Sequence, residues 1–290
     1  MVFGIISVVK EEITEKEIVY MNKTVGFIGL GNMARAMVGG IIAGGVADKK
    51  NIIASASTDK TLKNAEDTYG INVTIDNKEV AKKSDILFLA VKPNVYHIVI
   101  SEIKDCISPD TLIVTIAAGQ TIEDVEKMFG KEIRLIRTMP NTPAMVMEGM
   151  SLICPGENAA LEDLEDVLRI FNSFGKCEVV EEALIDTAGS LSGCGPAFVY
   201  VFIEALADAA VESGVKREMA YKLASQMVMG SAKMVLETKE HPGKLKDNVC
   251  SPGGTTIKGV NALEYSGFRG NVIDALLSSI EKSKEMSGNK

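Results

Sequence analysis

The order of apolar and polar positions predicts two kinds of structure along the chain. Up to residue 182, short continuous apolar runs alternate with stretches of helical spacing, as in parallel sheets with crossover helices. The predicted strands are 25–28, 51–54, 84–91, 112–116, 133–136 and 177–180. Beyond residue 182 nearly every segment has helical spacing. The sequence therefore predicts an α/β domain at 21–182, followed by an all-α domain at 183–290.

The first predicted helix of the second domain is unusually apolar. It follows a predicted turn at Leu191–Pro196, because proline suits the first turn of a helix. Its polar positions form one stripe: Glu204, Asp208 and Glu212. Such a helix must be buried on most sides, and in so small a domain we expect burial against another subunit. No His or Cys joins the carboxylate stripe, so a solvated or partner-facing edge is favoured over a metal site.

Two more helices are predicted at 217–237 and 271–284. In the first of them, one face carries large apolar side chains, interpreted as core filler: Met219, Leu223, Met227 and Met234. Between the two helices, residues 246–258 are interpreted as a polar, glycine-rich loop, with a further helix beginning near Thr255. The N–H groups of Gly254, Thr255 and Thr256 at that helix start would form an anion site of the size of a carboxylate.

The strand at 25–28 runs into a glycine-rich turn and then a helix, the order of the G-x-G-x-x-A dinucleotide-binding fingerprint. Gly29 allows the tight turn, Gly31 lets the backbone approach a pyrophosphate, and Ala34 lets the helix pack closely on the strand. The alternative is an ordinary glycine-rich turn, and the strand-turn-helix context favours the cofactor. The candidate cofactor residues here are Ile28, Gly29, Leu30, Gly31, Asn32, Met33 and Ala34.

The end of the second predicted strand bears on the choice of cofactor. NAD-preferring enzymes carry Asp or Glu there, roughly 20 residues beyond the glycines, to hold the ribose 2′-hydroxyl. This chain has small hydroxyl residues instead, and Ser55, Ser57 and Thr58 can donate to a 2′-phosphate. The sequence therefore favours NADPH over NADH. A plain strand-to-helix loop with an N-cap residue is the alternative interpretation.

Other candidates follow the later strands, because ligands of open α/β sheets lie beyond the carboxyl ends of the strands. Lys92 and Pro93 follow the strand at 84–91, and Ala117, Ala118 and Gly119 follow the next. The rigid polar loop around Asn141 and Thr142, with prolines on both sides, lies at the same edge. Such loops more often serve a site than not, although simple turn-making is the alternative.

Composition narrows the class of protein. The chain has 290 residues, 46% hydrophobic and 24% charged, as in soluble globular proteins of up to two domains. The net charge of -8 argues against nucleic acid or an anionic membrane, and no continuous apolar run reaches the length of a bilayer span. Five scattered cysteines and two distant histidines form no metal constellation and suit a reducing cytoplasm. Residues 1–20 are interpreted as a disordered extension.

The combined motifs resemble those of the pyrroline-5-carboxylate reductase family over nearly all of the chain from Met21. The segments that carry the resemblance are Gly26–Ala34, Ala90–Pro93, Ala117–Gly119, Met139–Pro143, Leu191–Ala197, His241–Val249, Ser251–Thr256 and Gly267–Arg269. The first is shared by many dehydrogenases, and the stretch from His241 to Thr256 is specific to the family. Cys194 departs from the family pattern, which usually has serine at this position, and we expect little effect.

The resemblance implies reduction of 1-pyrroline-5-carboxylate to L-proline by NAD(P)H, the last step of proline biosynthesis. It implies that Asn77, Ala90, Val91, Lys92, Pro93 and Ala117–Gly119 line the cofactor. It also implies that Gly254–Thr256 hold the substrate carboxylate, that Thr256 bonds the ring nitrogen, and that Glu182, Asn248 and Val249 lie near the substrate. Family members form dimers, and five dimers often make a decamer.

Two alternative functions stay open. β-Hydroxyacid dehydrogenases share the glycine-rich opening, but they carry a catalytic lysine early in the long helix, and here Pro196–Phe202 has no lysine. A nucleotide-sensing protein without catalysis would have no need for the anion site at Gly254–Thr256.

Hydride transfer to a protonated imine needs neither a nucleophile nor a metal, which agrees with the absence of an obvious His or Cys site.

Overall fold

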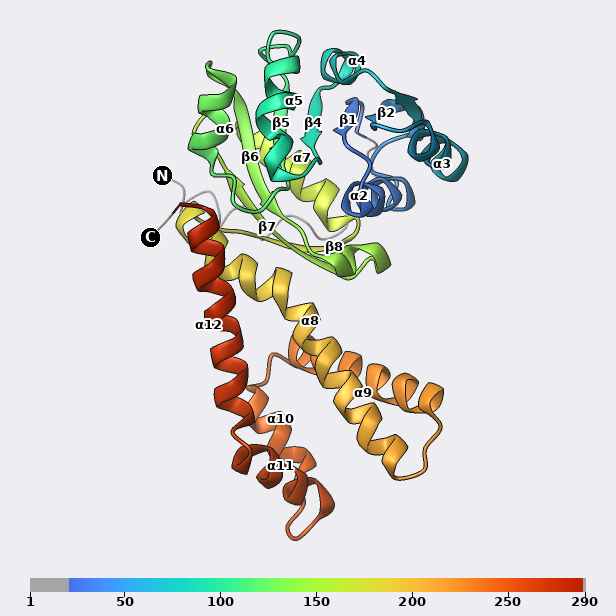
Figure 1. Ribbon diagram of the computed structural model, residues 1–290, viewed down its shortest axis with the longest axis vertical. Helices are drawn as coiled ribbons and strands as arrows, with labels where there is room; N and C mark the ends of the chain where they lie inside the picture. The colour runs from blue at the N-terminus through green and yellow to red at the C-terminus, as the bar shows by residue number, and fades with distance from the viewer. Residues whose placement is uncertain (1–20, 289–290) are drawn as a thin grey trace. The chain divides into compact units, whose positions relative to one another are not determined.

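The computed structural model describes residues 21–288, which divide into two compact units (Figure 1). The first unit comprises residues 21–193 together with 280–288, and the second comprises residues 194–279. The division falls inside the long helix α8 (Glu182–Glu212), whereas the predicted domain boundary lies at its first residue. That boundary stays a prediction, and the predicted extension at 1–20 lies outside the described residues.

The first unit is built on one eight-stranded sheet with the order β3-β2-β1-β4-β5-β6-β7-β8. All neighbouring strands are parallel except β6 and β7, which are antiparallel. The strands are β1 (Val25–Ile28), β2 (Ile52–Ser55), β3 (Asn72–Thr74), β4 (Ile86–Leu89), β5 (Leu112–Thr115), β6 (Arg134–Met139), β7 (Gly149–Pro155) and β8 (Gly175–Val179). The predicted α/β class is confirmed, and all six predicted strands exist with ends shifted by a few residues.

Helices cover both faces of this sheet and bury it, as expected for parallel strands. On one face, α2 (Asn32–Ala43), α3 (Asp59–Tyr69) and α7 (Leu161–Asn172) share a core with the sheet. On the other face, α4 (Asn77–Lys83), α5 (Tyr96–Ile103) and α6 (Ile122–Phe129) form a second core. Short 3-10 turns lie at Lys49–Asn51, Pro93–Val95 and Thr142–Val146.

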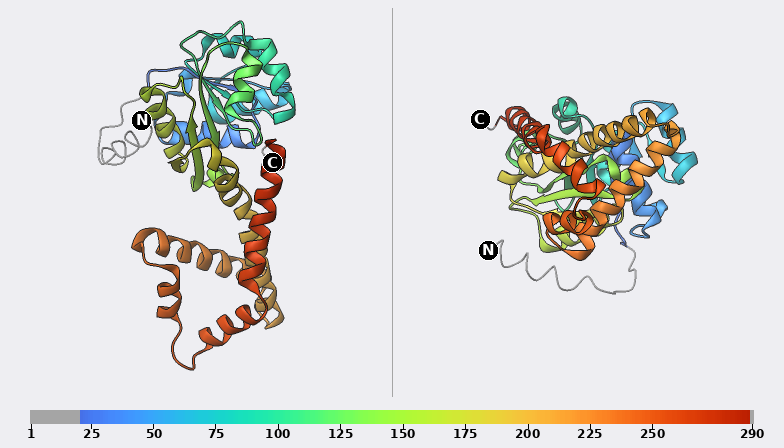
Figure 2. Two further views of the ribbon diagram at one scale, coloured as in Figure 1. Left: turned by 90° about the vertical axis from the view of Figure 1, so that its left-hand side faces the viewer. Right: turned by 90° about the horizontal axis from the view of Figure 1, so that it is seen from below.

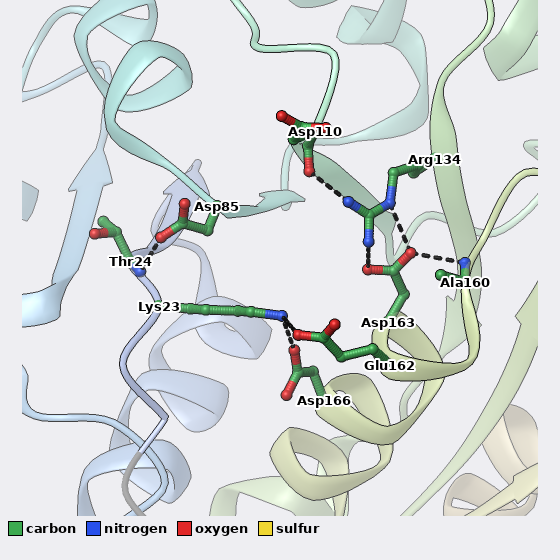
Figure 3. Close-up of polar contacts among 9 residues, drawn as sticks. All are labelled: Lys23, Thr24, Asp85, Asp110, Arg134, Ala160, Glu162, Asp163 and Asp166. Carbon is green, nitrogen blue, oxygen red and sulfur yellow. Dashed lines mark hydrogen bonds and ion pairs between the residues drawn. The ribbon is translucent and has the colours of Figure 1, made fainter.

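Ion pairs hold together the amino-terminal ends of the strands, the edge opposite to the predicted site (Figure 3). Arg134, at the start of β6, binds the carboxylate of Asp163 and donates to the carbonyl of Asp110 at 2.9 Å. The Asp163 side chain is only 3% exposed and also accepts from the N–H of Ala160 at the start of α7. Nearby, Lys23 donates to Glu162 and Asp166 of α7. These contacts fasten α7 to the sheet.

Replacing Arg134 with methionine is expected to destabilise the fold without reducing turnover. The substitution keeps the length of the side chain but leaves the buried Asp163 carboxylate without its cation, at a cost of about 2 to 3 kcal/mol for this partly exposed pair. Chemical denaturation would measure the loss. Lys127→Met is the matched control, because its ion pair with Glu123 is solvent-exposed and its removal should leave the midpoint unchanged. Equal effects of the two substitutions would contradict a structural role for Arg134.

The second unit is built of helices (Figure 2), and few of its residues are buried. It contains most of α8, α9 (Arg217–Thr238), α10 (Pro242–Val249), α11 (Thr255–Tyr265) and the first part of α12 (Phe268–Met286). In α9 only Ala220 and Ala224 are buried, and α10, α11 and α12 have no buried residue. The all-α prediction is confirmed for this part of the chain.

Three predictions in this region are wrong. Leu191–Pro196 is no turn, since α8 passes through Pro196 without a break. Residues 246–249 of the predicted loop belong to α10. The apolar face of α9 is not core filler within the chain, because its large side chains are about half exposed: Met219, Leu223, Met227 and Met234. The physical cause of this last error is that no other part of the described chain covers that face.

The unbroken α8 also changes the hydropathy picture. Among residues 21–288, α8 is the one helix that is both long enough and apolar enough to cross a membrane. Its mean hydropathy is 1.5 over an 18-residue window. The predicted turn at Leu191–Pro196 divides this helix, so its full length is not evident from the sequence. Only 6% of that 18-residue window is buried within the chain. Length and composition alone do not distinguish a bilayer span from a helix that a second subunit covers.

Candidate active site

The parallel registers bring the predicted cofactor residues to one edge of the sheet. Ile28, the last residue of β1, pairs with Ser55 of β2 and with Leu89 of β4, and Leu89 pairs with Thr115 of β5. The four strands therefore end at the same level. The turns that follow them carry Gly29–Ala34, Ser57, Ala90–Pro93 and Ala117–Gly119. The carboxyl edge of β2, β1, β4 and β5 thus unites segments that the sequence analysis predicted separately.

The two glycines of the fingerprint, Gly29 and Gly31, differ in whether the fold requires glycine at their positions. Gly29 has a φ of +100°, and a Cβ placed there would lie 2.7 Å from the carbonyl oxygen of Ala90. The fold itself therefore requires this glycine. Gly31 has an ordinary φ of -68°, and a Cβ placed there would meet no protein atom within 4 Å. The fold tolerates a side chain at Gly31, so no packing contact within the described chain requires glycine there.

The start of α2 fits a dinucleotide pyrophosphate. Gly31 is its N-cap residue, no side chain caps the helix, and its first turn holds no acidic residue. The N–H groups of Asn32, Met33 and Ala34 therefore point at the edge of the sheet without a side-chain acceptor. Free N–H groups and the helix dipole both favour an anion. The residues predicted to bind the cofactor pyrophosphate suit that group.

The three hydroxyl residues at and beyond the end of β2, Ser55, Ser57 and Thr58, have different surroundings. Ser55 is 1% exposed, and its hydroxyl donates to Oδ1 of Asn77 at 2.7 Å. Asn77 in turn donates to Glu102 of α5 at 2.8 Å. Thr58 caps α3, where its Oγ1 accepts from the N–H of Thr61. Ser57 is exposed and is thus the residue of the predicted set that is free to meet a 2′-phosphate.

Ser57→Asp is therefore expected to reverse the cofactor preference. A carboxylate beside the 2′-phosphate would repel it, raising the KM for NADPH by at least about tenfold. The KM for NADH, which has only a hydroxyl there, should stay within about twofold of the wild-type value. Ser57→Asn is the neutral control of the same size. The prediction is contradicted if Asp and Asn change the two KM values equally.

A buried tyrosine, Tyr96, holds the end of β4 next to the segment Ala90–Pro93. Tyr96 of α5 is fully buried, and its hydroxyl donates to the carbonyl of Leu89 at 2.7 Å. Burial raises the pKa of this hydroxyl, so it stays protonated as a donor. Lys92 and Pro93 lie exposed beyond the strand, and Val91 is half-buried. The sequence alone does not predict a role for Tyr96, because an aromatic residue in an apolar helix resembles ordinary core.

The end of the C-terminal helix α12 lies against the segment Ala117–Gly119, which follows β5. Ala117 is buried and Ala118 is half-buried. Gly119 has a φ of +73°, and a Cβ there would lie 3.4 Å from the carbonyl oxygen of Met286 at the end of α12. Ser287 and Ser283, from the same end of the chain, donate to Asp186 of α8 at 2.9 and 3.4 Å. These contacts all lie within the first unit.

A buried arginine organises the start of α8. Arg137 of β6 is 2% exposed, and it donates to Glu182 at 2.9 Å and to Asp186 at 3.4 Å. Glu182 also accepts from the N–H of Ile122 at 2.7 Å, at the start of α6. Cys154 is the register partner of Arg137 on β7, and burial and then Glu182 raise its pKa to about 11. Cys154 is thus a neutral thiol, unsuited to act as a nucleophile.

The predicted substrate residues belong to the second unit, apart from Glu182. Gly254 is the N-cap residue of α11, again without a side-chain cap, and its own N–H donates to the carbonyl of Ser251 at 3.0 Å. Thr255 and Thr256 open the helix, and Gly253 turns into it with a φ of +70°. Asn248 and Val249 end α10, and Val249 is 67% exposed. This helix start suits a carboxylate for the same reasons that α2 suits a pyrophosphate.

The fold and its carboxyl edge define a class of protein, an NADP-dependent oxidoreductase with a Rossmann-type domain and a separate helical domain. Residues 24–119 match the family described as NADP oxidoreductase, coenzyme F420-dependent. Residues 182–286 match the family described as pyrroline-5-carboxylate reductase dimerisation. The second match covers the helices whose apolar faces are exposed in a single chain, and it supports a homo-oligomer.

Relatives of known name agree with both matches. The pyrroline-5-carboxylate reductase of Escherichia coli is 49% identical over 268 residues, which are 92% of this chain and 99% of that protein. That of Methanosarcina acetivorans is 44% identical over 265 residues, 91% and 98% of the two chains. The crystal structure of the Plasmodium falciparum pyrroline carboxylate reductase with NADP bound is 37% identical, with a TM-score of 0.84 over 93% of this chain and 100% of that one.

The chain therefore belongs to the pyrroline-5-carboxylate reductase family. The predicted family, fold class, enzyme class and reaction are confirmed. The predicted NADPH cofactor is confirmed as well, through the NADP oxidoreductase match and the NADP-bound relative. The roles of individual residues stay predictions.

Proposed function

We propose that this chain reduces 1-pyrroline-5-carboxylate to L-proline by placing two anions at two matched helix starts. The pyrophosphate of NADPH binds at α2 and the substrate carboxylate at α11. Each of these helices has a glycine N-cap and no side-chain cap, which is the observation that carries the proposal. Backbone N–H groups are fixed donors, so both sites hold an anion with little loss of side-chain entropy.

The main task of the protein in this reaction is to position NADPH and the imine relative to each other. Bound NADPH supplies the hydride, which adds to the imine carbon, and the nitrogen ends as a secondary amine. The protonated imine is already an electrophile, so neither a nucleophile nor a metal is required. Holding two reactants in the correct orientation can supply much of the rate.

Thr256 is the residue that we assign to the reacting group. Its N–H belongs to the carboxylate site, and its half-buried hydroxyl orients the ring nitrogen. A threonine hydroxyl is a weak acid, so the proton of the product amine comes from solvent. Asn248, Val249 and Glu182 complete the substrate surroundings in this proposal. Glu182 acts there while held by Arg137.

The cofactor set extends from the fingerprint to the neighbouring strands. Ser57 meets the 2′-phosphate, and Asn77 is held for the ribose side by Ser55. Lys92 supplies a cation beyond β4, with Ala90, Val91 and Pro93 shaping its turn. Ala117, Ala118 and Gly119 line the cofactor beyond β5. These segments share the carboxyl edge through the strand registers.

We further propose a dimer that closes over the exposed apolar helices, with five dimers in a decamer. The exposed side chains of α8 and α9, among them Tyr200, Val201 and Leu223, would be buried in the dimer. The same burial gives α8 a role in assembly rather than in a bilayer. The five cysteines are all unpaired, in agreement with a cytoplasmic location. Sedimentation of the purified chain distinguishes a dimer from a decamer.

The test of the function is NADPH oxidation followed by absorbance, with and without 1-pyrroline-5-carboxylate, and with NADH in parallel. We expect fast oxidation that depends on the substrate, with NADPH the better donor. Binding of NADPH without turnover would contradict the reaction and favour a nucleotide-sensing protein. Turnover of a β-hydroxyacid in place of the imine would favour the other dehydrogenase family.

A further inference from the structure

Helix α8 passes through a proline, which leaves one carbonyl without its helical partner. Pro196 has no N–H, so it cannot donate to the carbonyl of Ser192, four residues earlier. That carbonyl instead accepts a hydrogen bond from Nδ2 of Asn141 at 2.9 Å. Asn141 lies in the loop after β6, far away in the sequence. A side-chain amide thus stands in for the missing backbone donor.

The Asn141 side chain is fixed from both ends. It is 7% exposed, and its Oδ1 accepts from the N–H of Met150 on β7 at 2.9 Å. Next to it, Met139 packs against α8 at Gly189, where any larger side chain would overlap the Met139 sulfur. The loop and the helix therefore approach closely, and the amide has no freedom to turn away. This contact is built into the first unit and is not a surface encounter.

The contact between Asn141 and the Ser192 carbonyl lies where the two compact units divide. The two compact units divide between Gly193 and Cys194, directly after the Ser192 carbonyl and before Pro196. The cofactor residues precede this point in the chain, and the proposed substrate turn at Gly254–Thr256 follows it. Loss of helical order at Pro196 would loosen the presentation of the substrate turn, whichever subunit's cofactor the turn meets, and small misplacements reduce rates strongly.

We propose that Asn141 is a positioning residue for hydride transfer, because its amide replaces the N–H that Pro196 lacks and keeps α8 continuous between the two units. This inference rests on the proposed placement of NADPH and of the substrate turn. Asn141 touches neither reactant in this proposal. Its effect should therefore appear in kcat and in helix order, while NADPH affinity stays unchanged.

A double-mutant cycle tests the pair directly. The full-length oligomeric enzyme would be prepared as wild type, Asn141→Ala, Pro196→Ala and the double variant. Asn141→Ala should lower kcat on the order of tenfold, with the NADPH dissociation constant within about twofold of wild type. Pro196→Ala adds an N–H that can donate to Ser192, so in the double variant kcat should recover. Asn141→Asp keeps the acceptor for Met150 but loses the donor, and it should resemble Asn141→Ala.

Thermal unfolding gives a second readout that does not depend on the reaction. Pro196→Ala should raise the melting temperature more in the Asn141→Ala background than in wild type, because only there does it satisfy an unpaired carbonyl. Equal increases in the two backgrounds would overturn the inference, as would an Asn141→Ala enzyme with normal kcat. If the wild-type enzyme does not turn over the imine, the proposed function fails, while the melting temperatures still decide whether the two residues are coupled. If Asn141→Ala does not fold, recovery of folding in the double variant supports the inference and its absence overturns it.

Discussion

Gly31→Val is expected to abolish NADPH binding and turnover while the protein stays folded. The backbone at Gly31 has a φ of -68° and a ψ of -179°, a conformation that valine adopts readily. A Cβ there would meet no protein atom within 4 Å, so the substitution adds no clash inside the chain. The added isopropyl group would instead occupy the approach of the pyrophosphate to the N–H groups of α2. We expect the dissociation constant of NADPH to rise by at least about a hundredfold, the loss of two or more charge-assisted hydrogen bonds.

Gly29→Val is the matched control, two residues away. Its φ of +100° and the Ala90 carbonyl at 2.7 Å make any side chain incompatible with the fold. This variant should lose much of its stability, measured by thermal unfolding without cofactor, whereas Gly31→Val should melt within a few degrees of wild type, because its only cost is a poorer N-cap residue for α2. Binding would be followed by the increase in melting temperature on addition of NADPH. A Gly31→Val protein that still gains stability from NADPH would contradict the assignment of the pyrophosphate site.

These two glycines illustrate what the sequence could and could not predict. The strand-turn-helix pattern is sufficient to predict which edge of the sheet binds the cofactor, because the pattern is local and its geometry is stereotyped. The pattern cannot separate the glycine that the fold requires, Gly29, from the glycine that we assign to the ligand, Gly31. That distinction depends on how closely β4 approaches β1, and the approach follows from strand pairing between segments far apart in the sequence.

Long-range contacts also explain the features that the sequence analysis missed. Strand β3 is short and partly exposed, and β7 joins the sheet antiparallel after the turn at Thr142–Val146. Neither one is a long apolar run, so neither gives the signal of a buried parallel strand. Pro196 was read as a helix start because proline normally lacks an interior place in a helix. The donor that makes it tolerable, Asn141, comes from the loop after β6 and cannot be inferred from local spacing.

The polar residues of the proposed site also fall into two groups, those that local sequence predicts and those whose surroundings depend on long-range contacts. The anion site that we propose at α11 can be predicted from its glycines and the following helix, while the role proposed for Thr256 rests on the family resemblance alone. The buried partner of Glu182, Arg137, is not predicted, because nothing in the sequence of β6 indicates which carboxylates its two arginines will meet. Ser55 was expected to face the cofactor directly, and the structure instead turns its hydroxyl to Asn77.

Thr256→Ala is expected to impair reduction of the imine while leaving NADPH binding intact. The alanine keeps the backbone N–H at the second position of α11, so the carboxylate site is preserved. Only the hydroxyl that orients the ring nitrogen is lost. A hydrogen bond to a charged group contributes about 1.5 to 3 kcal/mol, so kcat/KM for the imine should fall by about ten- to a hundredfold. Steady-state rates and NADPH titration on the same preparation would measure both quantities.

Two neighbouring variants make this result specific to the hydroxyl. Thr256→Ser retains the hydroxyl and should keep most of the activity. Thr255→Ala removes the hydroxyl of an exposed neighbour and keeps its N–H, so its kcat/KM should stay near that of wild type. If Thr256→Ala and Thr255→Ala lost activity equally, the helix start as a whole, and not one oriented hydroxyl, would control the reaction. If Thr256→Ala lost NADPH affinity along with turnover, the hydroxyl would belong to the cofactor site, since a group that contacts only the imine cannot alter binding of NADPH to the free enzyme.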